Sequence, residues 1–324
     1  MKRILSAFLC VALVAAAVFA FSSCNGTGKK YTVGICQLAV HPALDEATRG
    51  FKEALISELG EGNVTFDYQN ASGEIAVCPT IINNFVSKNV DLIMANATPA
   101  LQAAANATSE IPILATSITE YGVALGLKDF NGTTGINVSG TSDLAPLDTQ
   151  AQMIIDLIPG VKTVGLLYCS AEQNSKYQVD VVKAYLESKG VTATLFSFSD
   201  SNDIQAVCNA AAAASDVIYV PTDNTAANSA DLINTISRET KTPVVAGEEG
   251  ICTKCGTFTL SISYYQIGYK TGVMAAKILR DGADVSKMPI EYDPQPVKMY
   301  NEDNCNFFGL TVPEGFKKIE TSAN

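Results

Sequence analysis

The stretch KTVGLLYCSAEQNSKYQVDVVKAYLESKGVTATLFS, residues 162–197, decides the fold class. Its first part, 162–168, is rich in apolar and β-branched residues and predicts a buried strand. Residues 175–189 place apolar side chains at helical spacing and predict a helix, and 191–197 predicts a second strand. Two strands joined through a helix form a parallel crossover unit, because a parallel pair needs a long connection.

The same alternation continues along most of the chain in two successive rounds. The first round starts with the β-rich run 31–37 and ends with an expected strand at 133–138. The second starts with an expected helix at 143–158 and reaches a long helix at 264–280. Strands that alternate with helices of this length indicate parallel sheets covered by helices on both faces. The sequence therefore predicts an α/β protein with two doubly wound lobes.

Composition excludes several classes of protein. The chain has 324 residues, with 22 Lys and Arg against 33 Asp and Glu, so its formal net charge is −11. Nucleic acids are poor partners for such a chain, because phosphate neutralisation supplies most of that affinity. A single histidine disfavours a His-based metal site or catalytic dyad, and no serine elbow, zinc-helix motif or nucleotide glycine fingerprint is present. We expect no catalytic residue, no metal and no cofactor.

The N-terminal segment predicts export and lipidation. A basic start precedes the apolar run 4–21, and Ser22-Ser23-Cys24 follows it. This pattern is typical of a secretory signal, and it resembles the bacterial lipobox, in which the cysteine is lipidated. We expect 1–23 to be a lipoprotein signal peptide, and 24–30 to be the lipidated Cys24 with a short tether. The alternatives are an uncleaved anchor and an ordinary signal peptide.

Seven cysteines remain outside the export segment, and an odd number cannot all pair with one another. Their dispersion along the chain is not typical of a disulfide framework. Only Cys252 and Cys255 have a suggestive spacing, and a lone CxxC is weak evidence for metal or redox chemistry. Reduced thiols, a local disulfide and a metal or redox role all stay open.

The topology indicates where a ligand binds. In open parallel sheets, ligands lie beyond the carboxyl ends of the strands, and polar residues recur at those positions in this chain. The predicted ligand-binding residues are Gln37, Asn70, Thr98, Thr116, Ser117, Thr119, Glu120, Tyr168, Glu172, Asn174, Ser175, Asp223, Asn224, Glu248 and Tyr264.

Five groups of residues match motifs of a known family. They are 34–45 with 50–51, 91–100, 168 with 172–175, 220–224, and 264–268. Together they resemble bacterial ABC-transporter substrate-binding proteins, in the lipoprotein family that includes the tryptophan/tyrosine-binding component TrpX. The resemblance extends over about 31–312, which is most of the chain.

This resemblance implies a type I periplasmic-binding-protein fold, with two lobes joined by three crossovers. Lobe 1 would be 31–138 plus 262–284, lobe 2 would be 139–261 plus 285–320, and 321–324 would be a tail. The lobes would close on an aromatic amino acid by hinge motion and deliver it to a membrane permease driven by a partner ATPase. Those subunits would be separate, because the chain has no phosphate-binding loop. Its only attachment to the membrane would be the lipid, on the extracytoplasmic face of a bacterial cell membrane.

An amino acid would need three kinds of partner in such a cleft. Its carboxylate needs hydroxyl groups and the N–H groups of helix starts, for which the candidates are Thr98, Thr116, Ser117, Asn174 and Ser175. Its ammonium needs a buried carboxylate, for which the candidates are Asp223, Glu172, Glu248 and Glu120. An aromatic ring needs ring faces, for which the candidates are Tyr121, Tyr168, Tyr264 and Tyr265. His41-Pro42 is interpreted as a turn and helix cap.

Two departures from the family pattern leave the ligand open. Residues 118–121 are Ile-Thr-Glu-Tyr, where the family commonly has Val-Thr-Asp-Pro, and Ser263 stands where an Asp is frequent. The alternatives are a sensing module for a membrane receptor, or an importer component for another amino acid, a nucleoside or a sugar. The chain has no Trp for sugar stacking, which disfavours the sugar.

Overall fold

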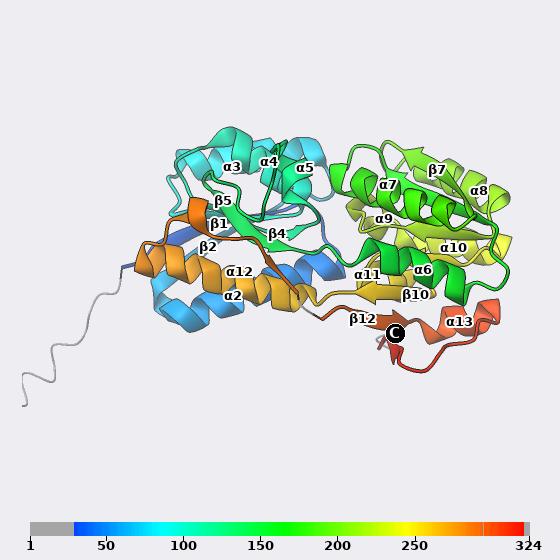
Figure 1. Cartoon of the computed structure of the whole chain (residues 1–324). Helices are drawn as coiled ribbons and strands as arrows, with labels where there is room; N and C mark the ends of the chain where they lie inside the picture. The colour runs from blue at the N-terminus through cyan, green and yellow to red at the C-terminus, as the bar shows by residue number, and fades with distance from the viewer. Residues whose placement is uncertain (1–28, 294, 321–324) are drawn as a thin grey trace, which may run out of the picture. The chain divides into compact units, whose positions relative to one another are not determined.

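The computed structural model describes residues 29–293 and 295–320 (Figure 1). The expected signal peptide, Cys24, most of the tether and the tail at 321–324 lie outside the described residues. Among the described helices, none combines the length and the apolar character needed to cross a membrane.

The first lobe is built on a parallel sheet. Its described strands are ordered β11-β5-β4-β3-β1-β2. Their bounds are β1 Tyr31–Gln37, β2 Val64–Asn70, β3 Leu92–Asn96, β4 Ile113–Ile118, β5 Val138–Ser142 and β11 Glu291–Tyr292. One face is covered by α2 (Pro42–Leu59) and α12 (Tyr264–Asp281). The other carries α3 (Cys78–Ser87), α4 (Thr98–Ala107) and α5 (Tyr121–Leu125). Short 3₁₀ turns lie at Glu61–Asn63, Ile75–Val77 and Val285–Lys287.

The second lobe has a sheet of order β13-β12-β10-β9-β8-β6-β7 among the described strands, and only β12 runs antiparallel to its neighbour β10. The bounds are β6 Thr163–Cys169, β7 Thr192–Phe198, β8 Val217–Val220, β9 Val244–Ala246, β10 Phe258–Ser261, β12 Val297–Tyr300 and β13 Lys317–Lys318. Helices α6 (Leu147–Leu157) and α7 (Gln173–Ser188) pack on one face. On the other lie α8 (Ile204–Ala214), α9 (Asn224–Asn228), α10 (Ala230–Thr240) and α11 (Glu249–Lys254), while α13 (Glu302–Phe308) follows β12. The predicted pair of doubly wound α/β lobes is confirmed.

The predicted lobe boundaries need two corrections. The strand expected at 133–138 is wrong, because Gly132 and Gly135 adopt positive φ angles of 99° and 72° and hold this segment in turns. The strand β5 begins at Val138 instead, and it pairs with β4 in the first sheet. The two-residue strand β11 also joins the first sheet, beside β5. Segments 139–142 and 285–292 therefore belong to lobe 1.

Among the described residues, the chain passes between the lobes at three places, which we call the hinge. They are 143–146, 262–263, and residues 293 and 295–296. The first hinge segment starts at Asp143, whose N–H donates to the carbonyl of Ile118 at 3.1 Å. The second leads directly into α12, whose first residue is Tyr264.

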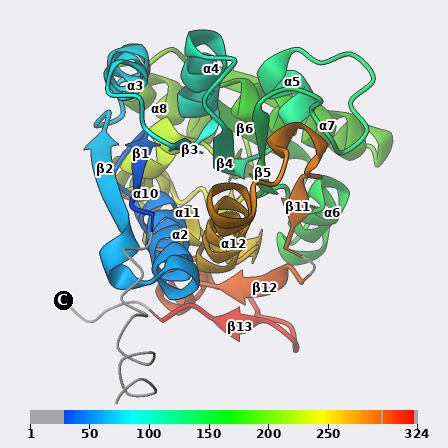
Figure 2. The same ribbon diagram turned by 90° about the vertical axis from the view of Figure 1, so that its left-hand side faces the viewer.

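Helices α2 and α12 lie side by side at very close range (Figure 1 and Figure 2). A Cβ atom added at Gly268 of α12 would lie 2.0 Å from the carbonyl oxygen of Ala47, and one at Gly50 of α2 would lie 2.2 Å from that of Tyr265. Only glycine permits such an approach of two backbones. The contact fixes the start of α12, with Tyr264, beside the start of α2, with His41.

Candidate functional site

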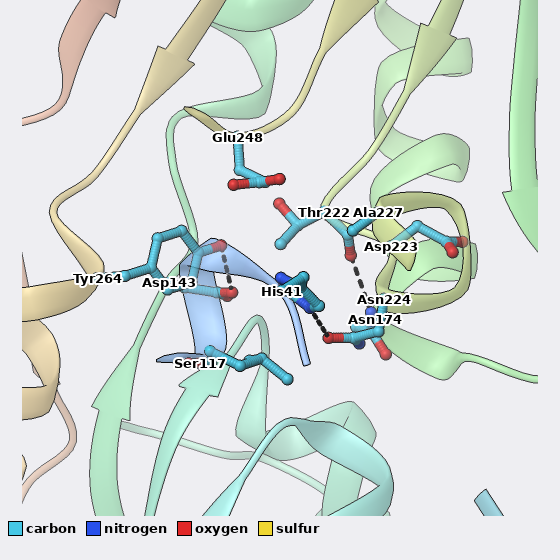
Figure 3. Close-up of a pocket in the computed structure, with 11 residues that line it drawn as sticks. His41, Ser117, Asp143, Asn174, Thr222, Asp223, Asn224, Ala227, Glu248 and Tyr264 are labelled. Atoms are coloured by element: carbon cyan, nitrogen blue, oxygen red, sulfur yellow. Dashed lines mark hydrogen bonds between the residues drawn. The ribbon is translucent and has the colours of Figure 1, made fainter. Parts of the chain in front are cut away.

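A cavity with an empty volume of about 280 Å³ lies where the carboxyl ends of strands from both lobes meet (Figure 3). This is the position that the topology predicts. The first lobe contributes residues that follow β1, one near the end of β4 and one at the start of α12. The second contributes residues that follow β6, β8 and β9, and the hinge contributes Asp143. The lining residues are His41, Leu44, Ser117, Asp143, Asn174, Thr222, Asp223, Asn224, Ala227, Glu248 and Tyr264.

Four buried polar atoms of this lining have no hydrogen-bond partner among the described residues. They are His41 Nδ1, Ser117 Oγ, Asp143 Oδ1 and Asn174 Oδ1, and each of these residues is at most 7% exposed. A buried polar group without a partner costs free energy, so native proteins rarely leave several together. Their convergence on one cavity indicates a binding site for a polar ligand.

His41 reaches across the cavity to the second lobe. Its Nε2 lies 3.2 Å from Asn224 Oδ1, and Asn224 directs its Nδ2 to Glu172 Oε2 at 2.6 Å. Because that bond fixes the amide, Asn224 Oδ1 can only accept, and His41 Nε2 carries the hydrogen. Burial lowers the pKa of His41, so the ring is neutral and Nδ1 is an acceptor. His41 stands at the N-cap position of α2, as expected, but its side chain makes no capping hydrogen bond and is directed to the cavity instead.

Asp143 supplies the one carboxylate oxygen of the lining that lacks a partner. Its Oδ2 accepts a hydrogen bond from the Tyr264 hydroxyl at 3.0 Å, and its Oδ1 faces the cavity unpaired. Burial raises the pKa of Asp143 to about 6, so the group is mostly ionised at neutral pH. None of the lining residues is Lys or Arg. The cavity therefore offers an uncompensated negative charge at the hinge.

The amide of Asn174 is also oriented by its surroundings. Its Nδ2 donates to the carbonyl of Thr222 at 2.9 Å and to Glu172 Oε2 at 3.2 Å, which leaves Oδ1 toward the cavity. Ser117, on the opposite lobe, has a left-handed backbone with φ 58°. Such strain in a non-glycine residue is often found at ligand-binding positions.

Three of the carboxylates predicted to bind an ammonium also cap helices. Asp223 accepts from the N–H of Ala226 at 2.8 Å and of Cys169 at 2.6 Å, and burial raises its pKa to about 8. Glu248 accepts from the first N–H groups of α11, and burial raises its pKa to about 7. Glu120 does the same for α5.

Glu172 is saturated as well. Its two oxygens accept five hydrogen bonds, from the Nδ2 of Asn174, from the N–H and Nδ2 of Asn224, and from the N–H and Oγ1 of Thr225. This carboxylate therefore ties the start of α9 to the start of α7. All four predicted ammonium partners thus accept hydrogen bonds from the protein itself, and both oxygens of each already have a partner.

The structure brings six of the predicted site residues onto the cavity: Ser117, Asn174, Asp223, Asn224, Glu248 and Tyr264. Others lie behind it and hold its walls. Gln37 bonds Asp45 and Thr48 at the start of α2, Thr116 bonds Thr141, and Ser175 accepts from Asn174. Thr119 accepts from Gln178 of the second lobe at 3.4 Å, and Thr98 begins α4.

Other predicted residues do not reach the cavity. Asn70 uses its amide in the turn after β2, where it bonds Ser72 and Tyr68. Tyr168 packs in the core of the second lobe. Tyr121 is buried in the first, where its hydroxyl donates to the carbonyls of Ala115 and Thr141. Tyr265 lies on the outer face of α12 and bonds Glu53. Of the predicted aromatic walls, only Tyr264 lines the cavity.

Five lining residues were not among the predicted ones: His41, Leu44, Asp143, Thr222 and Ala227. Asp143 was placed in an expected helix at 143–158, whereas α6 begins only at Leu147. Asp143 directly follows β5, just as the other candidates follow their strands. A prediction that ended this strand at Ser142 would therefore have included Asp143 among the candidates.

The seven cysteines of the described residues are free and buried. Cys252 and Cys255 form no disulfide with each other. Within the described part of the chain, no group of three or more His, Cys, Asp or Glu side chains could hold a metal ion.

Comparison with known proteins identifies the family. Residues 32–323 match the family of ABC transporter substrate binding proteins. The chain belongs to this family. It is a binding protein and not an enzyme. A tyrosine-binding protein of Clostridioides difficile (strain R20291) is similar to it, with 34% identity over 300 residues, which cover 91% of this chain and 86% of the relative.

Two solved structures of this ABC transporter substrate-binding type cover 90% of the chain and the whole of the other protein. An ABC domain in complex with L-Trp from Streptococcus pneumoniae has 30% identity and a TM-score of 0.85. The ligand-free, open structure of a substrate binding protein with adhesive properties from Clostridium difficile has 38% identity but a TM-score of 0.68. The fold is that of type I periplasmic binding proteins. The closer match to the ligand-bound protein agrees with the bonds that join the lobes, such as Gln102 Nε2 to Gln173 Oε1 at 2.9 Å.

Proposed function

We propose that this substrate-binding protein is a lipid-anchored component of an ABC importer, which closes its lobes on an aromatic amino acid outside the membrane and delivers it to the permease. One observation carries the proposal: four unpaired polar atoms, from both lobes and the hinge, converge on one cavity. The tyrosine-binding relative and the L-Trp complex support an aromatic amino acid as the ligand.

The ammonium group of the ligand is assigned to Asp143. This residue offers an ionised carboxylate with one free oxygen, in a lining that has no cation. A charge-assisted hydrogen bond to an ammonium would satisfy that oxygen and balance its charge. Asp143 lies in the first hinge segment, and it accepts a hydrogen bond from Tyr264, which directly follows the second hinge segment. An ammonium bound to Asp143 would therefore contact the point about which the lobes move.

The first lobe offers a place for the ligand carboxylate. Ser117 presents its free hydroxyl at the end of β4, and a hydroxyl can donate to a carboxylate. Leu44 and Ala227 provide apolar walls, and the rings of His41 and Tyr264 provide aromatic ones.

Isothermal titration tests the proposed ligand class. The purified protein is unfolded and refolded to remove any carried-over ligand, and is then titrated with L-Tyr, L-Trp and L-Phe. We expect micromolar or tighter binding of at least one of the three. L-Leu and D-galactose serve as controls for apolar and sugar ligands. Absence of heat with all three aromatic amino acids would refute the proposed ligand class.

The lipid anchor has its own test, because it depends on residues that the structure does not describe. We expect wild-type protein to incorporate a labelled fatty acid and to sediment with membranes. The Cys24→Ser variant should incorporate none and appear in the soluble extracytoplasmic fraction. Membrane retention of Cys24→Ser without label would contradict the lipid anchor and favour an uncleaved signal.

A further inference from the structure

We infer that His41 and Asn174 form a subsite that accepts a hydrogen bond from the side chain of the ligand, so that the protein binds Tyr or Trp and discriminates against Phe. The inference rests on the proposed function and adds to it the feature by which the cavity selects among aromatic amino acids. The observation behind it is whether each of the four unpaired atoms can donate or only accept a hydrogen bond.

Three of the four atoms can only accept. His41 Nδ1 is an acceptor, because the neutral ring uses its hydrogen at Nε2 toward Asn224. Asn174 Oδ1 is an acceptor, because the amide nitrogen is held by Thr222 and Glu172. Asp143 Oδ1 is an acceptor as a carboxylate oxygen. Only the hydroxyl of Ser117 can also donate. A ligand that fills the cavity must therefore carry several hydrogen-bond donors.

The ammonium of an amino acid cannot satisfy all three acceptors if it binds at Asp143. Figure 3 shows Asp143 and Tyr264 together at one side of the cavity, and Asn174 and Asn224 together at the other, with His41 between them. A ligand held by its ammonium at Asp143 would direct its side chain toward His41 and Asn174. That side chain must then carry the second donor.

The aromatic amino acids differ in this respect. The phenol of Tyr and the indole of Trp each present one donor, whereas the ring of Phe presents none. Bound Phe would leave the acceptors of His41 and Asn174 buried without a partner, as both residues are at most 7% exposed. Sites built to hydrogen-bond a substrate group reject the analogue that lacks it far more strongly than apolar pockets reject a missing methylene. We expect Phe to bind at least about 100-fold more weakly than the better of Tyr and Trp.

The test uses wild-type protein and four ligands of similar size: Tyr, 4-amino-phenylalanine, Phe and 4-fluoro-phenylalanine. The first two carry a donor at the end of the ring and the last two do not. If Tyr is the preferred ligand, 4-amino-phenylalanine should bind within about tenfold of Tyr, while Phe and 4-fluoro-phenylalanine should both be at least about 100-fold weaker. If Trp is preferred, 1-methyl-tryptophan, which lacks the indole N–H, should show the same loss.

Two variants locate the selection at His41. In His41→Phe the acceptor is replaced by an apolar ring, and we expect the ratio of donor to non-donor affinity to fall below about tenfold, with Phe bound as well as or better than by wild type. In Tyr265→Phe, a matched aromatic change on the outer face of α12 and outside the cavity, the ratio should be retained. The ratio comes from ligands measured on one protein sample, so a general loss of folded protein leaves it unchanged.

The outcomes are distinct. If wild type binds Phe within threefold of both Tyr and Trp, the inference is overturned while the proposed function stands. If wild type discriminates but His41→Phe keeps the full ratio, the assignment to His41 is overturned. If no aromatic amino acid binds, the proposed function fails and the inference fails with it.

Discussion

The substitution Asp143→Asn should stabilise the empty protein and at the same time weaken ligand binding. Asn keeps an oxygen that can accept from the Tyr264 hydroxyl, now 3.0 Å from Asp143 Oδ2. It also keeps the shape of the side chain, while it removes the charge and replaces the second acceptor oxygen by an amide NH2 donor. The variant thus separates the cost of a buried charge from its use in binding.

The stability effect follows from the raised pKa of Asp143, which is about 6 instead of an ordinary value of 3.8. Well below pH 3.8 the carboxyl is protonated in both folded and unfolded chains, and it costs nothing. As pH rises from 3.8 to about 6, the unfolded chain ionises while the folded chain keeps its proton, so the free energy of unfolding falls. A pKa difference of about two corresponds to about 3 kcal/mol above pH 6. We expect Asp143→Asn to raise the free energy of unfolding by about 1–3 kcal/mol at pH 7.5 and to leave it almost unchanged at pH 3.5.

The binding effect has the opposite sign. Loss of one partner of a buried charge pair costs about 2–5 kcal/mol, so the affinity of Asp143→Asn for Tyr or Trp should fall at least about 30-fold. Wild-type affinity should also fall as pH drops below about 6, because Asp143 must lose its proton to receive an ammonium, whereas the affinity of Asp143→Asn should not show this loss.

Urea denaturation at pH 3.5 and 7.5, with titration calorimetry from pH 5 to 8, measures both effects. Asp148→Asn, an exposed aspartate at the start of α6, is the matched control and should change neither. Wild-type affinity in Asp143→Asn at pH 7.5 would refute the assignment of the ammonium to Asp143. A variant that is less stable than wild type at pH 7.5 would refute the argument from burial of an unpaired charge.

Three further predictions test the framework around the cavity. Gly268→Ala places a Cβ 2.0 Å from the carbonyl oxygen of Ala47 and should lower the free energy of unfolding by about 2 kcal/mol or more. The control Gly62→Ala has open space around it and should not lower it. Equal denaturation midpoints for the two variants would contradict the close packing of α2 on α12. Tyr264→Phe removes the donor to Asp143 and should weaken ligand binding about tenfold, while Tyr265→Phe, on the outer face, should leave the affinity unchanged; calorimetry that ranks them the other way would show the wrong tyrosine in the site. The buried cysteines should react with a thiol reagent only after unfolding, since burial raises the pKa of most of them, and fast labelling of native protein would contradict their burial.

The repeated units of the fold could be predicted from sequence because each carries its own signal. The segment 162–197 alternates a buried strand, an amphipathic helix and another strand, and β6, α7 and β7 lie where that pattern places them. The pattern failed where strands are short or interrupted. β11 has two residues, too few for a periodic signal, and Gly135 ends the apparent strand before β5. Those two elements decide where the first lobe ends.

The site was predictable in position but not in the roles of its residues. A carboxylate that follows a strand can cap the next helix or face a ligand, and the sequence signal is the same for both. Asp223 and Glu248 turned out to cap helices while they line the cavity. Asp143 acquires its importance from Tyr264, 121 residues further along the chain. Such a pairing depends on how the hinge segments meet, which local sequence patterns do not encode.

A crystal structure of the protein with bound L-Tyr tests the central claim most directly. We expect the amino acid to lie between the lobes, with its ammonium nitrogen about 2.7–3.2 Å from Asp143 Oδ1 and its phenol directed at His41 Nδ1 or Asn174 Oδ1. An ammonium held by Glu248 or Asp223 instead, or a ligand bound outside the cavity, would contradict it.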